Sequence, residues 1–329
     1  MHSLICIGEL IVDFIPLDNS AGLAGPAGFK PAPGGAPANV AAGYSKLGGQ
    51  AAVISKVGRD PFGAFLLEHL RAAGVYTGMI LQTAEAQTGL AFVFKNREGE
   101  NEFILYRNRS ADMLLQVKEL EIDPIRNSSI LQFGSISLMG GPARESTLEA
   151  VRVAIEAGSV ISFDPNLRPA AWPDLKQARQ AILEGLALAT ILKASISELF
   201  FIANNRSGSI KLAVRALFEN YPRLELIAVT KAEEGSFLCT RRQIIEVPPY
   251  TVDSLDPTGA GDSYMAALLF QIHHQLLQGN NTKLDWNRPD HFWKDLGRFA
   301  NIAGALTTEN YGAMSAMPDY QKIADANWE

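Results

Sequence analysis

The chain has 329 residues, of which 35 are acidic and 29 basic, and its formal net charge at pH 7 is −6. Hydrophobic residues make up 47% of the chain and charged residues 19%, a balance that excludes general disorder and supports a large core. An acidic chain without a block of Lys and Arg is a poor general binder of nucleic acid or of an anionic membrane. Its two cysteines, Cys6 and Cys239, are too few for a disulfide framework or a thiolate zinc site.

The N-terminal segment has none of the features of a signal peptide. Charge appears early, at Glu9 and Asp13, and no basic segment precedes the first apolar run. No stretch of the sequence approaches the ~20 consecutive apolar residues that cross a bilayer. We therefore expect a cytoplasmic protein whose partners are small molecules, with neither nucleic acid nor a membrane among them.

The first third of the chain predicts alternating strands and helices, followed by a hairpin. In chain order, we expect a strand over 4–15, a loop rich in Gly, Ala and Pro over 18–37, a helix over 38–47, a strand over 51–57, a helix over 61–73 and a strand over 75–81. Two extended runs, 89–95 and 102–107, flank the polar segment Asn96–Glu100, a pattern typical of a hairpin.

The rest of the chain alternates between strand and helix patterns. The expected strands lie at 130–134, 160–164, 190–193, 226–230, 236–240 and 243–247, and the expected helices at 144–157, 175–188, 210–221, 260–277 and 289–308. The last two strands suit a small antiparallel pair near the sheet edge. Strands separated by helices predict an α/β fold, a doubly wound, mostly parallel sheet, in one domain over 1–329. Such sheets bind ligands outside the carboxyl ends of their strands.

Two segments carry residues suited to ligand chemistry, and the first is Gly34-Gly35-Ala36-Pro37-Ala38-Asn39, directly before a predicted helix. Paired glycines let the backbone approach a ligand closely, and Asn39 can both donate and accept hydrogen bonds. A tight turn with an Asn near a helix start explains the same residues equally well. This segment alone leaves both interpretations open.

The second segment is Asp256-Pro257-Thr258-Gly259-Ala260-Gly261-Asp262, followed by an apolar helix. Small residues expose successive backbone N–H groups at a helix start, and these groups form a ready anion site. Asp262 then lies in or beside the first turn, where the helix dipole favours its ionised form by ~0.3–1 kcal/mol. Without further observations, a helix-start carboxylate and two turn glycines explain the segment as well.

An anion site with a carboxylate beside it suits phosphoryl transfer, in which a protein mainly positions the reactants and neutralises charge. A carboxylate that orients an acceptor hydroxyl and takes its proton late fits the loose transition state. The sequence lacks a P-loop element, the protein-kinase motifs and, after the first strand, a dinucleotide-binding glycine fingerprint. These absences exclude phosphate binding by a P-loop and make a dehydrogenase a weaker interpretation.

Residues 34–63 (GGAPANVAAGYSKLGGQAAVISKVGRDPFG) and 256–269 (DPTGAGDSYMAALL) resemble, in order and separation, the two signature regions of the ribokinase-like, or PfkB, sugar kinase family. The resemblance extends from Gly8 to Pro318. It implies ATP-dependent transfer of a phosphoryl group to a hydroxyl, commonly on a sugar. It also implies a central α/β domain with a small β lid, contributed here mainly by about 12–34 and 88–110.

The resemblance assigns roles to particular residues of this chain. Asp262 matches the catalytic base. The family's anion hole corresponds to Gly259, Ala260 and Gly261, and its sugar-binding positions to Asp13, Gly34, Gly35 and Asn39. Nucleotide contacts are implied for Thr230, Gly235, Gly259, Gly261 and Asn301. The nucleotide loop departs from the family pattern, because Ala232 stands where glycine is usual.

The resemblance also implies Mg²⁺, and K⁺ at a monovalent-cation site. Glu198 matches the Glu of the family's Asn-x-x-Glu element, which helps to hold Mg²⁺ through water, whereas Ser195 replaces the Asn. A helix cap in which Glu198 supports Ser195 or Ser197 is the alternative. Oxygens for the monovalent cation are expected from Asp256, Thr258, Thr307, Asn310 and Gly312.

Three segments narrow the choice of sugar. The segments 8–16, 106–114 and 164–168 resemble the opening, the lid-to-core passage and the Asp-Pro-Asn-x-Arg strand end of bacterial fructokinases. Through this resemblance Arg107 and Asn166 become sugar-binding candidates, and Arg168 a catalytic candidate that bridges sugar and phosphate. Solvent-exposed or salt-bridged roles for Arg107 and Arg168 are the alternatives.

The expected activity is the transfer of a phosphoryl group from MgATP to the 6-hydroxyl of D-fructose. The alternatives are a 2-keto-3-deoxygluconate kinase, because the same arginines could bind a carboxylate, and a ribokinase. A non-catalytic sugar or nucleotide sensor is a further alternative, although the base and the Gly-Ala-Gly turn that such a protein would lose are both present. A homodimer through the lid is also expected, since the hairpin could leave an apolar face for a second subunit.

Overall fold

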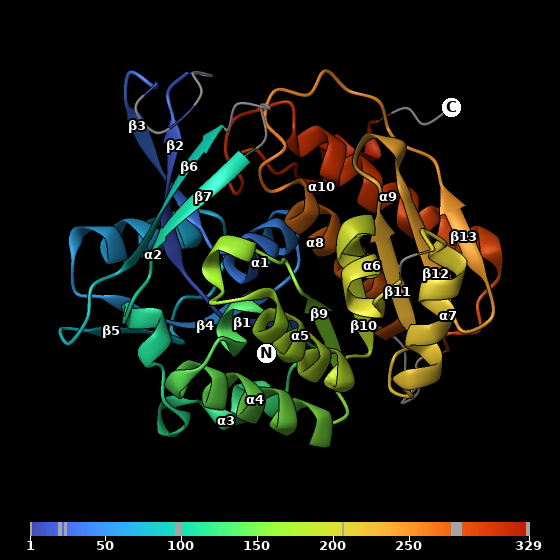
Figure 1. Ribbon diagram of the computed structural model, residues 1–329, viewed down its shortest axis with the longest axis horizontal. Helices are drawn as coiled ribbons and strands as arrows, with labels where there is room; N and C mark the ends of the chain where they lie inside the picture. Colours follow the sequence, from blue (N-terminus) through green and yellow to red (C-terminus); the bar gives the residue numbers. More distant parts are fainter. Residues whose placement is uncertain are drawn as a thin grey trace.

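The computed structural model describes residues 2–18, 22, 25–95, 101–205, 207–277 and 285–326, and a nine-stranded sheet runs through it (Figure 1). In spatial order its strands are β13 (Ile244–Val247), β12 (Ser236–Thr240), β11 (Leu226–Thr230), β10 (Ile191–Ser195), β9 (Val160–Asp164), β8 (Ile130–Gly134), β1 (Leu4–Ile7), β4 (Ala51–Gly58) and β5 (Ile80–Thr83). Neighbours from β5 to β11 are parallel, and β12 and β13 are added antiparallel. The predicted doubly wound, mostly parallel sheet is confirmed.

The order of the strands determines where a ligand can enter. The chain starts at β1 in the interior of the sheet, adds β4 and β5 on one side, and then adds β8 to β13 on the other. Connections that leave neighbouring strands in opposite directions open a crevice at the carboxyl ends of those strands. In this protein that crevice lies at the ends of β1 and β8.

Helices cover both faces of the sheet, because alternate side chains of the buried strands point to opposite faces. On one face, the apolar core includes side chains from α1 (Ala36–Lys46), α2 (Pro61–Ala72), α8 (Ala260–Ile272), α9 (Asp290–Thr307) and α10 (Tyr320–Ala324). On the other face it includes side chains from α3 (Ile122–Arg126), α4 (Gly141–Glu156), α5 (Leu175–Leu188), α6 (Ile196–Ala203) and α7 (Ile210–Asn220). None of the helices in the described part of the chain is long and apolar enough to span a membrane.

A second, four-stranded sheet, here called the lid, stands at the upper left of Figure 1. Its strands, in spatial order, are β3 (Phe29–Gly34), β2 (Ile11–Pro16), β6 (Gly89–Lys95) and β7 (Asn101–Tyr106). Strands β6 and β7 pair antiparallel, which confirms the predicted hairpin, whereas its turn at 96–100 lies outside the described residues. The lid therefore combines two segments that are far apart in the sequence.

Three sequence-based expectations are wrong in detail. The single strand expected over 4–15 is two strands, β1 and β2, which belong to different sheets; both carry buried side chains, so the apolar pattern does not reveal the break. The loop expected over 18–37 contains β3, whose prolines are tolerated because β3 is an edge strand. The strand expected over 75–81 is reduced to an isolated bridge at Tyr76 and to β5, which begins at Ile80.

Helices α1 and α8 pack unusually close together. A Cβ atom at Gly43 of α1 would lie 2.8 Å from Cβ of Ala266 on α8 and 2.9 Å from Sδ of Met317. Four residues earlier on each helix, about one turn, stand Asn39 and Asp262. The glycine thus allows the approach that brings these two polar side chains together.

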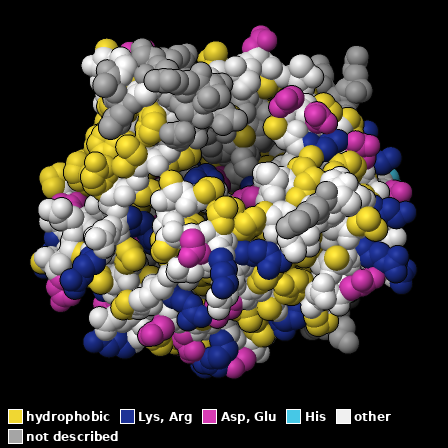
Figure 2. All heavy atoms as spheres, viewed as in Figure 1, with side chains coloured by type: hydrophobic (Ala, Val, Ile, Leu, Met, Phe, Trp, Pro, Cys, Tyr) yellow, Lys and Arg dark blue, Asp and Glu magenta, His cyan; other side chains and the backbone are white. Residues whose placement is uncertain are grey.

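Hydrophobic side chains gather on the upper left of the molecule, where Figure 1 shows the lid (Figure 2). Leu17, just after β2, and Tyr106, at the end of β7, are each 62% exposed. Pairing of two copies through this region of the lid stays a prediction.

Replacing Gly43 with Val should separate α1 from α8. Overpacking a tight contact typically costs about 1–3 kcal/mol, so we expect a thermal midpoint several degrees below that of the unmodified protein. Differential scanning calorimetry measures the change. Ala72→Val, on the exposed end of α2, is the control and should leave the midpoint nearly unchanged; a Gly43→Val protein as stable as this control would contradict the tight crossing.

Candidate active site

Two adjoining cavities open at the carboxyl ends of the strands, with volumes of about 730 Å³ and 470 Å³. The larger lies between the main sheet and the lid, and residues of β2, β6 and β7 line it together with residues that follow β1, β9 and β10. The smaller lies beside β11, α8 and α9. Ser195, Pro257 and Gly261 line both cavities, so the two meet at the start of α8.

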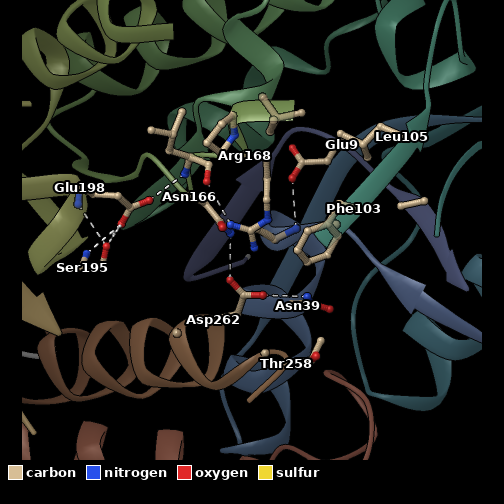
Figure 3. A pocket seen from close by; sticks show the side chains of 18 of the residues that line it. Glu9, Asn39, Phe103, Leu105, Asn166, Arg168, Ser195, Glu198, Thr258 and Asp262 are labelled. Atoms are coloured by element: carbon tan, nitrogen blue, oxygen red, sulfur yellow. Dashed lines mark hydrogen bonds between the residues drawn. The ribbon is translucent and has the colours of Figure 1, made fainter. Parts of the chain in front are cut away.

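Asp262 lies where the cavities meet and is 8% exposed. Its Oδ2 accepts a hydrogen bond of 2.8 Å from Nδ2 of Asn39, and its Oδ1 one of 3.4 Å from Nδ2 of Asn166 (Figure 3). Burial raises the pKa of Asp262, while the Asn39 hydrogen bond and the charges of Lys193 and Arg168 lower it. The net effect is an upward shift, which makes this carboxylate a stronger base than an exposed one.

The turn before Asp262 has the geometry of an anion site. Gly259 precedes α8 in the left-handed conformation, with φ of 82°, and a Cβ there would lie 2.6 Å from Cβ of Ala313. The helix begins at Ala260, whose N–H donates to the carbonyl oxygen of Pro257 at 3.2 Å, whereas the N–H groups of Gly261 and Asp262 have no partner within the helix. The helix dipole adds to the positive potential of these N–H groups, and together they favour a bound anion.

Two further carboxylates line the larger cavity. Burial raises the pKa of Asp13 to about 7, opposed by Arg168 and reinforced by Asp262 and Glu9. Burial likewise raises the pKa of Glu9 to about 7, opposed chiefly by Arg107. Glu9 is 6% exposed; its Oε1 accepts the Ala36 N–H at 3.2 Å, and its Oε2 has no hydrogen-bond partner among the described residues.

The glycines before α1 make room for these acids. A side chain at Gly34 would collide with the carboxylate of Asp13, and one at Gly35 with the backbone carbonyl of Glu9. Gly35 lines the larger cavity, whereas Gly34 lies behind Asp13. The paired glycines therefore fit a close approach of the backbone around a ligand pocket.

Two arginines line the larger cavity: Arg107 follows β7 of the lid, and Arg168 follows β9 of the main sheet. The guanidinium of Arg168 lies 5.0 Å from the ring centre of Phe103 on β7, so a lid side chain stacks on a core cation (Figure 3). Arg107 donates from Nε to Oδ2 of Asp112 at 2.6 Å, and both side chains are buried. Arg168 is held mainly by a ring, whereas Arg107 is engaged by an acid.

A buried ion pair lies beneath the start of α8. Lys193, on β10, has its Nζ 2.9 Å from Oδ2 of Asp164, at the end of β9. Oδ1 of Asp164 accepts the Asn166 N–H at 3.1 Å. Asn166 adopts a left-handed conformation with φ of 42°, which Asn tolerates, and its amide reaches Asp262.

The smaller cavity is lined by four of the five expected nucleotide positions, whereas Gly259 lines only the larger cavity. Thr230, Gly235 and Asn301 all line it. Asn301 donates from Nδ2 to the carbonyl oxygen of Pro248 at 2.8 Å. Ala232 adopts a positive φ of 51°, so the residue that replaces the family's usual glycine keeps a backbone conformation that glycine favours.

Glu198 lies on the wall of the larger cavity as part of a helix cap. Its Oε2 accepts the Ser195 N–H at 2.8 Å, its Oε1 accepts the Leu167 N–H at 2.7 Å, and Ser195 caps α6. The capping alternative is therefore realised. Oε2 also accepts the Ser195 hydroxyl at 3.0 Å, so Oε1 keeps the free lone pair that could accept a hydrogen bond from a water of a hydrated Mg²⁺.

Of the five residues expected at a monovalent-cation site, hydrogen bonds join Asp256, Thr258 and Gly312. Asp256 accepts hydrogen bonds from the Thr258 N–H and the Gly312 N–H, both at 3.0 Å. Thr307 donates to the carbonyl oxygen of Ala303 in its own helix, and Asn310 is exposed. In the described part of the chain, no group of three or more His, Cys, Asp or Glu side chains could hold a metal ion.

Comparison with known proteins identifies the family of this chain. The model of the pfkB family carbohydrate kinases matches residues 1–320. The chain belongs to the PfkB family of carbohydrate kinases. It is 40% identical to "Probable fructokinase-6, chloroplastic" of Arabidopsis thaliana over 98% of this chain and 82% of that protein, and 39% identical to "Fructokinase-1" of Oryza sativa subsp. japonica over 96% and 94%.

Solved structures agree with the fold of this PfkB kinase. A fructokinase from Xylella fastidiosa with bound ATP superposes with a TM-score of 0.87 at 31% identity, over 98% of both chains. A fructokinase double mutant from Vibrio cholerae O395, with fructose, ADP and potassium ion bound, gives a TM-score of 0.84 at 29% identity, over 98% of this chain and 97% of that one. The ribokinase-like fold, with its small β lid, is confirmed.

Among the residues of the kinase's larger cavity that were assigned no role from the sequence are Glu9, Phe103 and Lys193. A signal existed for two of them, because Glu9 and Lys193 are charged residues within apolar strand patterns. A charge at such a position is rarely buried without a partner or a function. Phe103 carried no signal, since a strand aromatic is ordinary until the lid is placed over Arg168.

The raised pKa of Glu9 predicts a cost to stability that depends on pH. Because its pKa is about 7 in the folded protein and 4.5 as a free side chain, its contribution is most favourable below pH 4.5 and is lost as the pH rises through 7. Glu9→Gln should thus stabilise the protein at pH 8 by about 1–3 kcal/mol, at ~1.4 kcal/mol per pKa unit, and much less at pH 4.5. Urea titrations at the two pH values measure this difference; an equal effect at both would contradict the buried, ionisable carboxylate.

Proposed function

We propose that this PfkB kinase transfers a phosphoryl group from ATP to the 6-hydroxyl of D-fructose, giving fructose 6-phosphate and ADP. The observation that carries the proposal is the position of Asp262, a buried carboxylate next to an anion site where two cavities meet. The larger cavity has room for a hexose and the smaller for part of a nucleotide. The relatives described as fructokinases, and the one with bound fructose and ADP, support this acceptor.

In the proposed reaction Asp262 is the general base. The acceptor hydroxyl lies within hydrogen-bonding distance of its carboxylate, attacks the terminal phosphorus of ATP and gives its proton to Asp262 as the new P–O bond forms. Asn39 and Asn166 hold the carboxylate in place. The upward shift of its pKa matches the task, because a base works best when its pKa lies close to the operating pH.

The start of α8 is the proposed anion hole. Gly259 and Gly261 present backbone N–H groups to the phosphoryl oxygens, and Ala260 joins them once its N–H leaves its 3.2 Å hydrogen bond to the carbonyl oxygen of Pro257. Arg168 adds a charge-assisted contact from the sugar side. Donors that are already oriented need no rearrangement as charge develops, and one such donor is typically worth about 10²–10³ in rate.

The chemistry of the larger cavity favours a neutral acceptor. Asp13, Glu9 and Asn39 offer oxygens and an amide to sugar hydroxyls, with Gly35 close behind them. An acidic acceptor such as 2-keto-3-deoxygluconate would meet three carboxylates, while Arg107 is already engaged by Asp112. Fructose is therefore preferred over the acidic alternative, and the relatives described as fructokinases support it over ribose.

The proposed reaction also requires binding sites for ATP and for the cations that accompany it. Thr230, Gly235 and Asn301 would contact ATP in the smaller cavity. Mg²⁺ would be held through water by Glu198 and would neutralise phosphate charge. K⁺ would be bound near Asp256, for which the Vibrio cholerae fructokinase with potassium ion bound is the supporting relative. We also propose that all 329 residues form one kinase domain with its lid.

A panel of acceptors tests the function. ADP release should be rapid with fructose and ATP, should require Mg²⁺, and should be much slower with 2-keto-3-deoxygluconate, ribose or adenosine. A coupled assay at a fixed enzyme concentration measures all four. If only 2-keto-3-deoxygluconate supports ADP release, it becomes the proposed acceptor in place of fructose. If none of the four compounds supports ADP release, the protein is better explained as a sensor.

Asp262→Asn should nearly abolish turnover without unfolding the protein. The loss of a general base typically lowers the rate by about 10²–10⁴, and the amide keeps the size of the side chain and its hydrogen bond to Asn39. Steady-state kinetics and circular dichroism measure the two properties. Asp123→Asn, at a side chain that is 90% exposed, is the control. An Asp262→Asn enzyme as fast as this control would remove Asp262 from the mechanism.

A further inference from the structure

Lys193 is a buried cation that the mechanism above does not use. The residue is 6% exposed, and its one hydrogen-bond partner among the described residues is Oδ2 of Asp164, at 2.9 Å. An ammonium group carries three N–H donors, so the ion pair leaves two of them without a protein acceptor in the described part of the chain. A lysine kept only for the fold would be expected to satisfy these donors within the core.

The ammonium group lies against the proposed anion hole. A Cβ atom built on Gly261 would come within 2.9 Å of Nζ of Lys193. Lys193 lines the larger cavity. Gly261 lines both cavities, and so does Ser195, which follows Lys193 by two residues. The absence of a side chain at position 261 therefore lets the ammonium approach the turn where the cavities meet.

The surroundings keep Lys193 charged. Burial lowers its pKa, but the negative charges of Asp164, Glu198 and Asp262 outweigh this effect and leave the pKa above its ordinary value. Asp164 also accepts the N–H of Asn166, whose side chain reaches Asp262. One carboxylate thus holds both the ammonium group and the backbone of the residue whose side-chain amide contacts the proposed base.

We propose that Lys193 is a catalytic residue, which donates hydrogen bonds to an equatorial oxygen of the phosphoryl group during its transfer, and that Asp164 is the positioning residue for Lys193. The inference rests on the proposed kinase reaction. The bond between the terminal phosphorus and the bridging oxygen of ATP breaks, the bond to the sugar oxygen forms, and the hydroxyl proton goes to Asp262. Lys193 keeps its protons throughout and neutralises charge on the group in transit.

The decisive variant removes both charges of the pair. Lys193→Met alone would leave the charge of Asp164 buried without a cation beside it, so the test uses Lys193→Met with Asp164→Asn. Lys56→Met with Glu119→Gln is the matched control, because this pair also joins a buried lysine to a carboxylate, at 2.7 Å, but lines neither cavity. If circular dichroism shows that the Lys193 double variant is unfolded, Lys193→Gln, whose amide can donate to Asp164, replaces it.

We expect kcat of the Lys193 double variant to fall by about 10²–10³, the usual effect of removing one donor to a charged transition state, with KM for fructose within about threefold. Affinity for ADP with aluminium fluoride and fructose, measured by calorimetry, should fall by a similar factor, while affinity for ADP alone should not change. A purely structural pair would leave kcat and the affinity for the aluminium fluoride complex at the level of the control.

The outcomes separate this inference from the proposed function. A folded double variant with kcat near that of the control overturns the role of Lys193, and so does a loss confined to KM for fructose. If the wild-type enzyme phosphorylates another sugar, the same variants are compared on that sugar. A wild-type enzyme that phosphorylates no sugar overturns the kinase proposal and the role of Lys193 with it.

Discussion

The hydrogen bond between Asn39 and Asp262 joins two parts of the chain that are 223 residues apart, and the candidate site is built around it. It forms because α1 and α8 approach within contact distance at Gly43 and Ala266, about one turn further along each helix. That approach brings the glycine-rich segment before α1 next to the anion site before α8. Each segment alone has an ordinary structural explanation; together they form one cavity wall.

Negative charge is concentrated where the proposed reaction must handle phosphate. Glu9, Asp13, Asp164 and Asp262 all have pKa values raised by burial, so the folded protein holds carboxylates in surroundings that oppose their ionisation. Such an arrangement lowers stability at neutral pH, and proteins commonly accept that cost at functional sites. A chain with net charge −6 can still bind phosphate because backbone N–H groups and a few buried cations provide the positive potential.

The lid contributes chemistry as well as cover. Phe103 of β7 stacks on Arg168, which follows β9, so the position of a core cation depends on a strand from the lid. Asp13, on β2, places a carboxylate from the lid in the same cavity. Because the lid contributes these groups, the acceptor cavity is complete only when both sheets are present.

The sequence by itself determined the class of fold and most element positions, and it predicted the residues at both ends of the candidate site. Periodic apolar patterns indicate buried strands and helices, and the two glycine-rich segments beside Asn39 and Asp262 point to a site when they are taken together. It could not reveal that 4–15 divides between two sheets, because strands buried in either sheet have the same apolar pattern. Tertiary structure alone decided that Lys193 meets Asp164 under the turn at Gly261, and that Glu198 caps a helix while facing the cavity. The ion pair depends on the distance between segments that are remote in the sequence, which no local pattern encodes. The cap of Ser195 and Glu198 is a local pattern, but its position on the cavity wall is set by the tertiary structure.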